Sequence, residues 1–379
     1  MHKNPHILGF GLALGLACGG AAAQSSVTLY GVVDLGIQHS RAGGVGNTTQ
    51  MISGGNATSR LGIRGREDMG DGLYAGFNLE SSLNADSGTG RPSNTNNQAS
   101  GAGTNSAGLT FDRMAFVSLG HVRYGELRMG HDFMPHHYNS IVFDPFSAVG
   151  VARAGNLTLS AVGSGPLFTT VTGSNTASYW LPKDMGGVYG MAMVGLGENA
   201  AGSPNEHDGN FVGGRLGYAT GPFDIAAAVT RTRYAITPTL GDYTHANLGA
   251  SWNAGFAKFF ALYNVVRIEQ QAGDVRKQTV ELGVQIPITA QSRIRASYLR
   301  LDDRSSAALV NANGSQRNGN DARQFGVGVV HDLSKRTALY GTYAKLQNRG
   351  QATYVPSAAR APLAGRNVSA LELGVRHAF

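Results

Sequence analysis

The chain has 379 residues, carries a formal net charge of +7 at pH 7, and contains 54 glycines but only 15% charged residues. An average soluble domain has about a quarter of its residues charged, and a soluble enzyme of this length usually shows helical periodicity, which this sequence does not. Its one cysteine, Cys18, lies near the N-terminus, which excludes a disulfide scaffold and a thiolate metal site from the rest of the chain.

The first 23 residues have the pattern of an export signal. Lys3 is followed by an apolar stretch over residues 7–17 and by three alanines before Gln24, which predicts a signal peptide cleaved after Ala23. The apolar stretch is shorter than the roughly 20 residues of a membrane-spanning helix. Lipidation of Cys18 is an alternative, but Gly15 stands where a lipoprotein signal has leucine.

Removal of residues 1–23 leaves 356 residues with a formal charge of +6. No linker, charge block or change of composition divides residues 24–379. We therefore expect one large domain rather than two.

Apolar residues alternate with polar ones along segments of about ten residues. Clear examples lie at 27–38, 223–230, 279–286 and 292–298. In the third of these, Val280, Leu282 and Val284 share one face, while Glu281 and Gln285 share the other. Period two is typical of a strand with one apolar and one wet face.

Short and long connections alternate between these segments. The short ones resemble tight turns at 70–72, 220–222, 287–289 and 332–335, and the long polar ones span 40–58, 85–109, 302–320 and 348–366. We count about sixteen strands. An even number of strands, with short turns at one end and long loops at the other, is typical of bacterial outer-membrane barrels.

The predicted fold is therefore all-β: a transmembrane antiparallel β-barrel of 16 strands. A closed barrel pairs every backbone polar group inside the membrane without leaving an edge. A secreted soluble β-sandwich or β-helix is the alternative, but this length would require several such domains with visible boundaries. The final segment supports a barrel, because Leu371, Leu373 and Val375 alternate with polar residues up to the terminal Phe379.

Several motifs resemble the general trimeric porins of Gram-negative bacteria, in the betaproteobacterial branch. They are Ser26-Val27-Thr28-Leu29-Tyr30-Gly31, Ser59-Arg60-Leu61-Gly62-Ile63-Arg64-Gly65 with Glu67-Asp68, Phe77-Asn78-Leu79-Glu80, the run from His331 to Tyr340, and the closing Gly374-Val375-Arg376-His377-Ala378-Phe379. The resemblance implies a homotrimer of sixteen-stranded barrels in outer-membrane lipid. We also expect the barrel assembly machinery to recognise Phe379.

The resemblance further implies that the third external loop folds inward and narrows the pore. This loop should follow the fifth strand, which we expect to end near Gly130. Its predicted residues include His131, Asp132, Pro135, Phe146 and Arg153. We expect the neighbouring His136 and His137 to be solvated loop residues and not metal ligands, because no third ligand is evident.

Alternation assigns the first pore residues. Arg60, Arg64 and Glu80 take the lumen face, since their neighbours Leu61, Ile63 and Leu79 take the lipid face. The resemblance adds Arg113 to the basic wall of the constriction and Asp144 to its acidic side.

Two positions depart from the simple pattern. Strict alternation would turn Arg113 toward lipid, so a bulge or a strand end must intervene. Thr172 stands where anion-selective members of the family have an arginine, and Arg153 and Lys183 are the candidates to replace it.

The predicted function is passive diffusion of ions and small hydrophilic solutes, with a preference for anions, in the Gram-negative outer membrane. We expect no cofactor, no metal and no nucleic-acid partner. A substrate-specific channel is one alternative, which would show aromatic rows or a charge ladder in the lumen. An outer-membrane enzyme is another, but pairs such as His131-Asp132 face opposite ways on a strand and cannot act as base and orienter.

Overall fold

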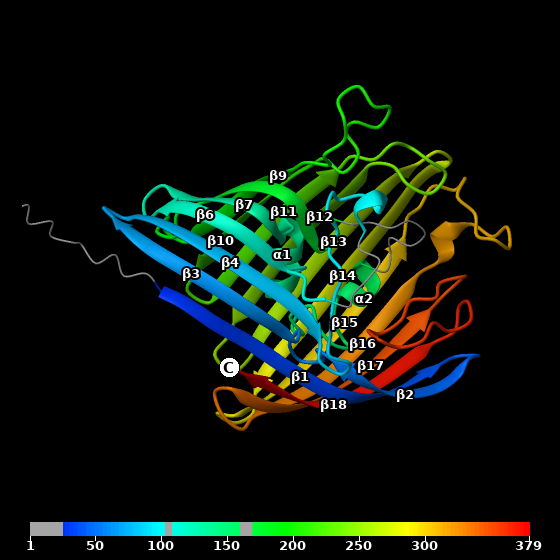
Figure 1. Cartoon of the computed structure of the whole chain (residues 1–379). Helices are drawn as coiled ribbons and strands as arrows, with labels where there is room; N and C mark the ends of the chain where they lie inside the picture. The colour runs from blue at the N-terminus through cyan, green and yellow to red at the C-terminus, as the bar shows by residue number, and fades with distance from the viewer. Residues whose placement is uncertain (1–25, 103–107, 160–168) are drawn as a thin grey trace, which may run out of the picture.

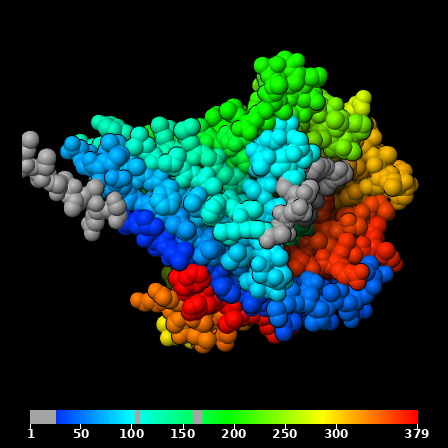
Figure 2. Space-filling model, in the orientation of Figure 1, coloured from blue at the N-terminus to red at the C-terminus, as the bar shows by residue number. Residues whose placement is uncertain are grey.

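The computed structural model describes residues 26–102, 108–159 and 169–379. Strands form a closed antiparallel barrel in which the last strand pairs with the first (Figure 1). In the space-filling view the red C-terminal strand lies beside the blue N-terminal one (Figure 2). The predicted fold class is confirmed, whereas the predicted signal peptide, residues 1–23, lies outside the described residues.

The elements follow one another as a meander around the barrel. The strands are β1 (Ser26–Ala42), β2 (Gly46–Ser53), β3 (Arg60–Gly70), β4 (Leu73–Asn84), β5 (Thr89–Gly90), β6 (Met114–His121), β7 (Gly125–Phe133), β8 (Thr172–Trp180), β9 (Val188–Gly195), β10 (Phe211–Thr220), β11 (Phe223–Thr232), β12 (Tyr243–Asn253), β13 (Lys258–Gln270), β14 (Gly273–Pro287), β15 (Ser292–Asp303), β16 (Ala322–Asp332), β17 (Thr337–Asn348) and β18 (Val368–Ala378). The helices are α1 (Pro135–Phe143) and α2 (Gly155–Thr158), with short 3-10 turns η1 (Ala99–Gly101) and η3 (Arg317–Gly319).

The eighteen strand segments of the described residues make up the sixteen strands of the barrel. β2 pairs with the C-terminal half of β1, and β3 pairs with its N-terminal half. β2 and β3 therefore form one strand of the barrel, which is interrupted at residues 54–59. β5 is a two-residue segment that pairs only with the end of β4, outside the barrel wall.

The four predicted tight turns all join strands at one end of the barrel. The predicted long segments 302–320 and 348–366 are loops at the other end, and so are the described residues of 85–109. The segment 40–58 is not a loop: β1 and β2 continue through most of it and meet in a turn at 43–45. This other end also has one very short connection, between β13 and β14 at 271–272.

Alternation separates the two faces of the wall as predicted. Along β11, Ile225 and Val229 are exposed on the outside, while Ala226, Ala228 and Thr230 are buried on the inside. Strand side chains point alternately to the two faces, so the exposed apolar set forms a continuous outer surface suited to hydrocarbon.

The connection between β7 and β8 contains both α-helices, although the sequence pattern predicts none. Pro135 occupies the first turn of α1, where its missing N–H costs no helical hydrogen bond. Among the described residues, no helix is both long enough and apolar enough to cross a bilayer.

Candidate functional site

Residues 134–158, the lumen segment, contact the inward face of the barrel wall. α1 lies against β10, β11 and β12, and α2 against β14 and β15 (Figure 1). The wall residues that the segment touches, such as Thr230 and Asn247, alternate with exposed outer residues, such as Val229 and Leu248. The segment therefore occupies space inside the ring of strands.

Glycines of the wall make room for this segment. A Cβ atom on Gly249 of β12 would overlap the Phe143 ring, and one on Gly283 of β14 would lie 2.5 Å from Pro145. A Cβ on Gly326 of β16 would lie 2.5 Å from Ala152. Any larger residue at these three positions would displace the segment.

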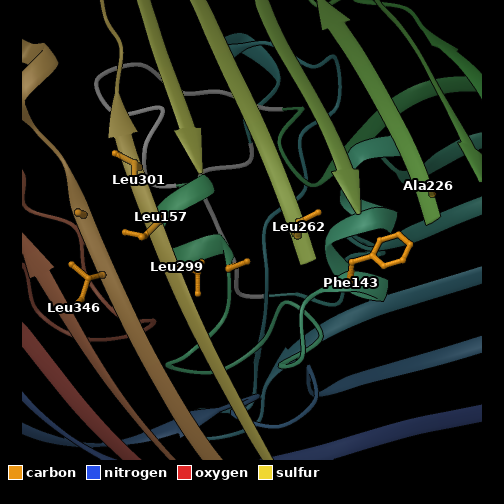
Figure 3. Packing of buried hydrophobic residues seen from close by; sticks show 9 residues of the cluster. Phe143, Leu157, Ala226, Leu262, Leu299, Leu301 and Leu346 are labelled. Carbon is orange, nitrogen blue, oxygen red and sulfur yellow. The ribbon is translucent and has the colours of Figure 1, made fainter. Parts of the chain in front are cut away.

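Apolar contacts hold the segment from the side of the wall. Phe143 and Leu157 pack with inward-facing leucines of three strands, Leu262, Leu299, Leu301 and Leu346, all at most 1% exposed (Figure 3). Leucines facing the lumen would be in water without this cover. Burial of a leucine contributes about 1.5 to 3 kcal/mol, so this cluster favours the seated position of the segment.

Polar contacts fix its orientation. The His136 ring lies 3.1 Å from the Thr230 hydroxyl and 4.0 Å, between centroids, from the His245 ring. The Asn156 side chain donates to Gln324 at 2.8 Å, and the Gln324 amide donates back to the backbone oxygen of Ala152 at 2.9 Å. The prediction that His136 and His137 are solvated is wrong, since they are 0% and 9% exposed.

The interruption of the second strand is held by Asp34 of β1. Its carboxylate accepts hydrogen bonds from the backbone of Asn56 at 2.8 Å and Ala57 at 2.6 Å, and from the Tyr340 hydroxyl at 2.7 Å. These bonds hold residues 54–59 inside the wall, immediately before Arg60.

A chamber of about 590 Å³ lies between the lumen segment and this part of the wall. Arg60, Arg113, Arg293, Arg295 and Arg376 line it, together with Glu80, Gln285, the segment 56–58, and His137, Ile141 and residues 147–149 of the lumen segment. Its walls thus bring together five guanidinium groups and one carboxylate.

Glu80 is shared by two of these arginines. Its carboxylate lies 2.5 Å from Nε of Arg113 and 3.3 Å from Nε of Arg60, and it accepts a hydrogen bond from the Tyr30 hydroxyl at 2.9 Å. Arg113 precedes the first residue of β6, so the expected strand end turns its side chain inward. One carboxylate cannot balance two guanidinium charges, and the pair of arginines keeps a net positive charge.

Three arginines of the chamber are not among the predicted pore residues. Arg293 and Arg376 share Asp332, at 2.6 Å and 3.8 Å, whereas Arg295 lies over the Phe146 ring at 4.8 Å and makes no ion pair with any described residue. The sequence carries a signal for two of them, because Arg293 and Arg295 alternate with Ile294 and Ala296. The alternation of residues within one strand does not show, however, that β15 and β18 line the same chamber as β3.

Other predicted pore residues lie elsewhere. Arg64 points inward but lines a separate hollow with Arg66 and Glu126, and its guanidinium lies 5.2 Å from the Tyr30 ring. Lys183 lies in the turn between β8 and β9, at the opposite end from the lumen segment. Lys183 therefore cannot replace the arginine that is missing at Thr172, the first residue of β8.

Asp144 does not line the chamber. It is 1% exposed and accepts hydrogen bonds from the backbone N–H groups of Phe146, Ala148 and Ala154 at 2.7 to 3.1 Å. Burial raises the pKa of Asp144 to about 6, against the opposing effect of these hydrogen bonds. Its role is to fold the lumen segment, because a carboxylate satisfied by its own loop has no free face toward a solute.

His131 and Asp132 are strand residues rather than loop residues, since β7 continues to Phe133. His131 contacts the Ser174 hydroxyl at 2.8 Å, and Asp132 accepts a hydrogen bond from the Tyr138 hydroxyl at 2.8 Å. Asp132 thus anchors α1 of the lumen segment, whereas His131 links β7 to β8 and to the residues before β6. Arg153 lies within the segment but does not line the chamber; its Nε donates to Asn156 at 3.2 Å.

The side of the chamber formed by the lumen segment has no charge. It presents His137, Ile141 and residues 147–149, none of them acidic. Burial and the nearby Arg113 lower the pKa of His137 to about 3, so its ring is neutral at physiological pH. The charged side chains that line the chamber therefore all come from the barrel wall. No group of three or more His, Cys, Asp or Glu side chains in the described part of the chain is placed to hold a metal ion.

Comparison with known proteins agrees with this architecture. The family model for Gram-negative porins matches residues 11–351. Outer membrane porin protein 32 of Delftia acidovorans is 31% identical over 374 residues, covering 97% of this chain and 98% of that protein. An outer membrane porin protein of Bordetella pertussis is 27% identical over 411 residues, covering 89% of this chain and 94% of that protein.

Solved structures give the same result. The anion-selective porin from Comamonas acidovorans has a TM-score of 0.80 and 30% identity, covering 94% of this chain and all of that one. OmpT of Vibrio cholerae shares the fold, with a TM-score of 0.63 at 13% identity over 94% of this chain and 99% of that one. Together with the closed barrel and its chamber, these matches show that the chain belongs to the Gram-negative porin family and forms a channel in the outer membrane.

Proposed function

We propose that the chain is an anion-preferring diffusion channel whose constriction is the arginine-lined chamber. The observation that carries the proposal is the excess of positive charge in this chamber. Five arginines line it against one lining carboxylate, Glu80, and a second carboxylate, Asp332, pairs with Arg293 and Arg376. The similar Comamonas acidovorans protein is described as anion-selective, which supports the same preference in this chain.

The field in the chamber acts on a permeating ion more strongly than the net charge of the protein does. Charges on the external loops are screened over about 8 Å at physiological salt. Ions that pass through the chamber come within a few ångströms of the guanidinium groups, where little solvent intervenes. Arg293, Arg295 and Arg376 supply positive charge from another part of the wall than Thr172, so the missing arginine there does not abolish the preference.

The zero-current potential in a KCl gradient tests this proposal. Arg60→Glu should shift it strongly toward cation preference, whereas Arg360→Glu, on the exposed part of an external loop, should shift it little. Both changes alter the net charge equally. Equal shifts would show that net charge sets selectivity, and the proposal would then fail.

The lumen segment is proposed to set the size of the pore. Of its predicted residues, Pro135 starts α1 and Phe146 packs in a buried cluster with Val151 and Ala152. Shortening the segment by deletion of residues 136–150 in a folded barrel should raise single-channel conductance. Unchanged conductance would contradict this role.

The arginine cluster also favours a second candidate, a channel with a saturable site for particular anions. A charge ladder of this kind is the feature that such a channel would carry. Conductance measured over a range of concentrations of chloride, dicarboxylates and sugars distinguishes the two. Linear conductance for all solutes supports general diffusion, and saturation for one class supports specificity.

We propose further that the mature protein begins at Gln24 and assembles as a homotrimer in outer-membrane lipid, with Phe379 recognised by the barrel assembly machinery. The Vibrio cholerae protein of the same fold is described in a trimer form. N-terminal sequencing and a heat-sensitive oligomer on detergent gels test the first two points.

A catalytic function is not proposed. The Ser174 and His131 pair resembles part of a nucleophilic site, but the other ring nitrogen of His131 faces the backbone oxygen of Asp112 at 3.0 Å instead of a carboxylate. Both residues are buried, at 7% and 9% exposure. A base without an orienting acid and without access to solvent is a structural contact.

A further inference from the structure

The separate hollow that Arg64 lines lies in the lumen between the chamber and the turn end of the barrel. It encloses about 280 Å³, and its walls come from β1, β3, β4, β6 and β7. Arg64 follows Arg60 by four residues toward the turn end, which is about 13 Å along a strand. The short turns of an outer-membrane barrel face the periplasm, so a solute that moves from the chamber toward the periplasm passes this hollow.

Two arginines of the hollow lie against aromatic rings instead of carboxylates. The guanidinium carbon of Arg66 is 3.6 Å from the centroid of the Tyr74 ring, and that of Arg64 is 5.2 Å from the centroid of the Tyr30 ring. Neither arginine side chain makes an ion pair or a hydrogen bond with any described residue. Stacking uses the face of a guanidinium group, whereas its N–H donors point outward in its plane. Both groups therefore keep their donors for a ligand.

Among the described residues that line the hollow, Glu126 of β7 is the only carboxylate, and it is already engaged. It lies 3.0 Å from Nε of Arg128 and accepts a hydrogen bond from the Tyr74 hydroxyl at 3.3 Å. Arg128 stacks over Phe116 at 4.7 Å but does not line the hollow itself. The two unpaired guanidinium groups therefore give the hollow an excess of positive charge, which attracts anions.

A glycine leaves a flat patch of backbone between these arginines and two aromatic rings. Gly76 of β4 lies directly opposite Arg66 of β3 and Ser118 of β6 in the strand register. Tyr74 and Phe116 lie two residues away from Gly76 and Ser118 on the same inward faces, and both line the hollow. A flat group that lies over Gly76 thus meets guanidinium donors on one side and aromatic rings on the other.

We propose that this hollow is a second binding site, which holds small aromatic carboxylates after they pass the chamber. The carboxylate accepts hydrogen bonds from Arg64 and Arg66, because its two oxygens match the planar fork of guanidinium donors. The aromatic ring lies over Gly76 against Tyr74 and Phe116, and such ring pairs add to the burial of apolar area. An inorganic anion lacks this contact. The site rests on the proposed function, since its ligands arrive as anions through the chamber.

The test measures the binding of sodium benzoate to the folded protein, purified from outer membranes into detergent, by isothermal titration calorimetry. The pair variant Arg64→Gln with Arg66→Gln should weaken benzoate binding at least tenfold, because two charge-assisted contacts are lost. The matched control is Arg123→Gln with Arg336→Gln. Both control arginines are exposed in turns at the same end of the barrel, so this variant removes the same charge outside the hollow.

A second pair of variants tests the hollow without changing any charge. Thr28 is exposed and lines the hollow, so Thr28→Phe should fill it and weaken benzoate binding at least tenfold. Thr220→Phe, at the exposed turn end of β10, should leave benzoate binding at the wild-type value. Acetate carries the same charge without a ring, and it should bind the wild-type protein at least tenfold more weakly than benzoate.

The second site is overturned if the arginine pair variant and its control bind benzoate equally, or if acetate binds as tightly as benzoate. Benzoate binding that is lost in Arg295→Gln but kept in the pair variant would assign the ligand to the chamber, and would equally overturn the second site. The zero-current potential is measured without benzoate. Failure of the chamber as the selective constriction therefore appears in a different measurement from failure of the hollow.

Discussion

The side-chain amide of Asn139 in α1 donates a hydrogen bond to Oδ1 of Asn247 in β12 at 2.9 Å. In return, the Asn247 amide donates to the backbone oxygen of His136 at 2.8 Å. One wall residue thus holds α1 at two points, and both asparagines are at most 5% exposed. The position of the lumen segment depends on this pair.

Asn247→Ala should therefore loosen the segment. A buried polar group that loses its partner costs about 1 to 3 kcal/mol, and here both the Asn139 amide and the His136 carbonyl lose one. Single-channel recordings should show larger current fluctuations than in wild type. Asn253→Ala, at the exposed end of the same strand, is the matched control, and equal noise in both variants would contradict the anchoring role.

Glu80→Gln should strengthen anion preference. Among the described residues, Glu80 is the only carboxylate that lines the chamber, and glutamine leaves a side chain of similar shape between Arg60 and Arg113. The zero-current potential in a KCl gradient should move further in the anion direction. A shift toward cations would mean that Glu80 acts mainly by holding the two arginines in place, which the thermal stability of the variant would reveal.

The arginines of β15 and β18 should contribute to selectivity as much as Arg60 does. Arg295→Gln and Arg376→Gln are each expected to reduce anion preference, because both side chains line the chamber. Arg64→Gln serves as the comparison, since Arg64 faces the lumen outside the chamber. A larger effect at Arg64 than at Arg295 would place the selective constriction elsewhere.

Acidification should weaken the docking of the lumen segment against the barrel wall, because His136 becomes protonated. Burial and the adjacent His245 lower the pKa of His136 well below its ordinary value of 6.5. The neutral His136 ring therefore contributes its full stabilisation to the docked lumen segment above pH 6.5. As pH falls further, docking weakens by about 1.4 kcal/mol per unit until the lowered pKa is reached.

Current fluctuations should accordingly increase as the pH falls below 6.5 in wild type and less so in His136→Gln. The raised pKa of Asp144 has the opposite effect on docking as the pH falls, because protonation of Asp144 stabilises the folded lumen segment. The comparison between the two proteins isolates the histidine. Identical pH dependence in both would exclude His136 as its source.

The barrel can be predicted from the sequence because each strand carries its own signal. Alternation at period two assigns both faces of the wall, and it places Arg60 and Glu80 in the lumen. The number of strands follows from the turns. These features are local, so one segment at a time suffices to recognise them.

The chamber cannot be assembled in this way. Family resemblance assigns Asp144 to its acidic side, but three backbone N–H groups of the lumen segment turn the carboxylate inward. Arg376 and Arg60 meet only after β18 closes on β1. His136 is buried because the segment folds back on β11 and β12. The position of each of these side chains depends on contacts between distant parts of the chain, which the alternation of residues within one strand does not reveal.

The permeability of the pore depends on two separate stretches of sequence, the lumen segment and the wall strands that carry the glycines opposite it. Gly249 and Gly283 belong to the wall, yet the space above them is filled by Phe143 and Pro145. Replacement of a single glycine by alanine or valine would push the segment toward the arginines and narrow the route for solutes without altering any residue of the constriction. A bacterial population under selection by a toxic solute could thus reduce its uptake in small heritable steps, while the outward surface seen by the membrane remains the same.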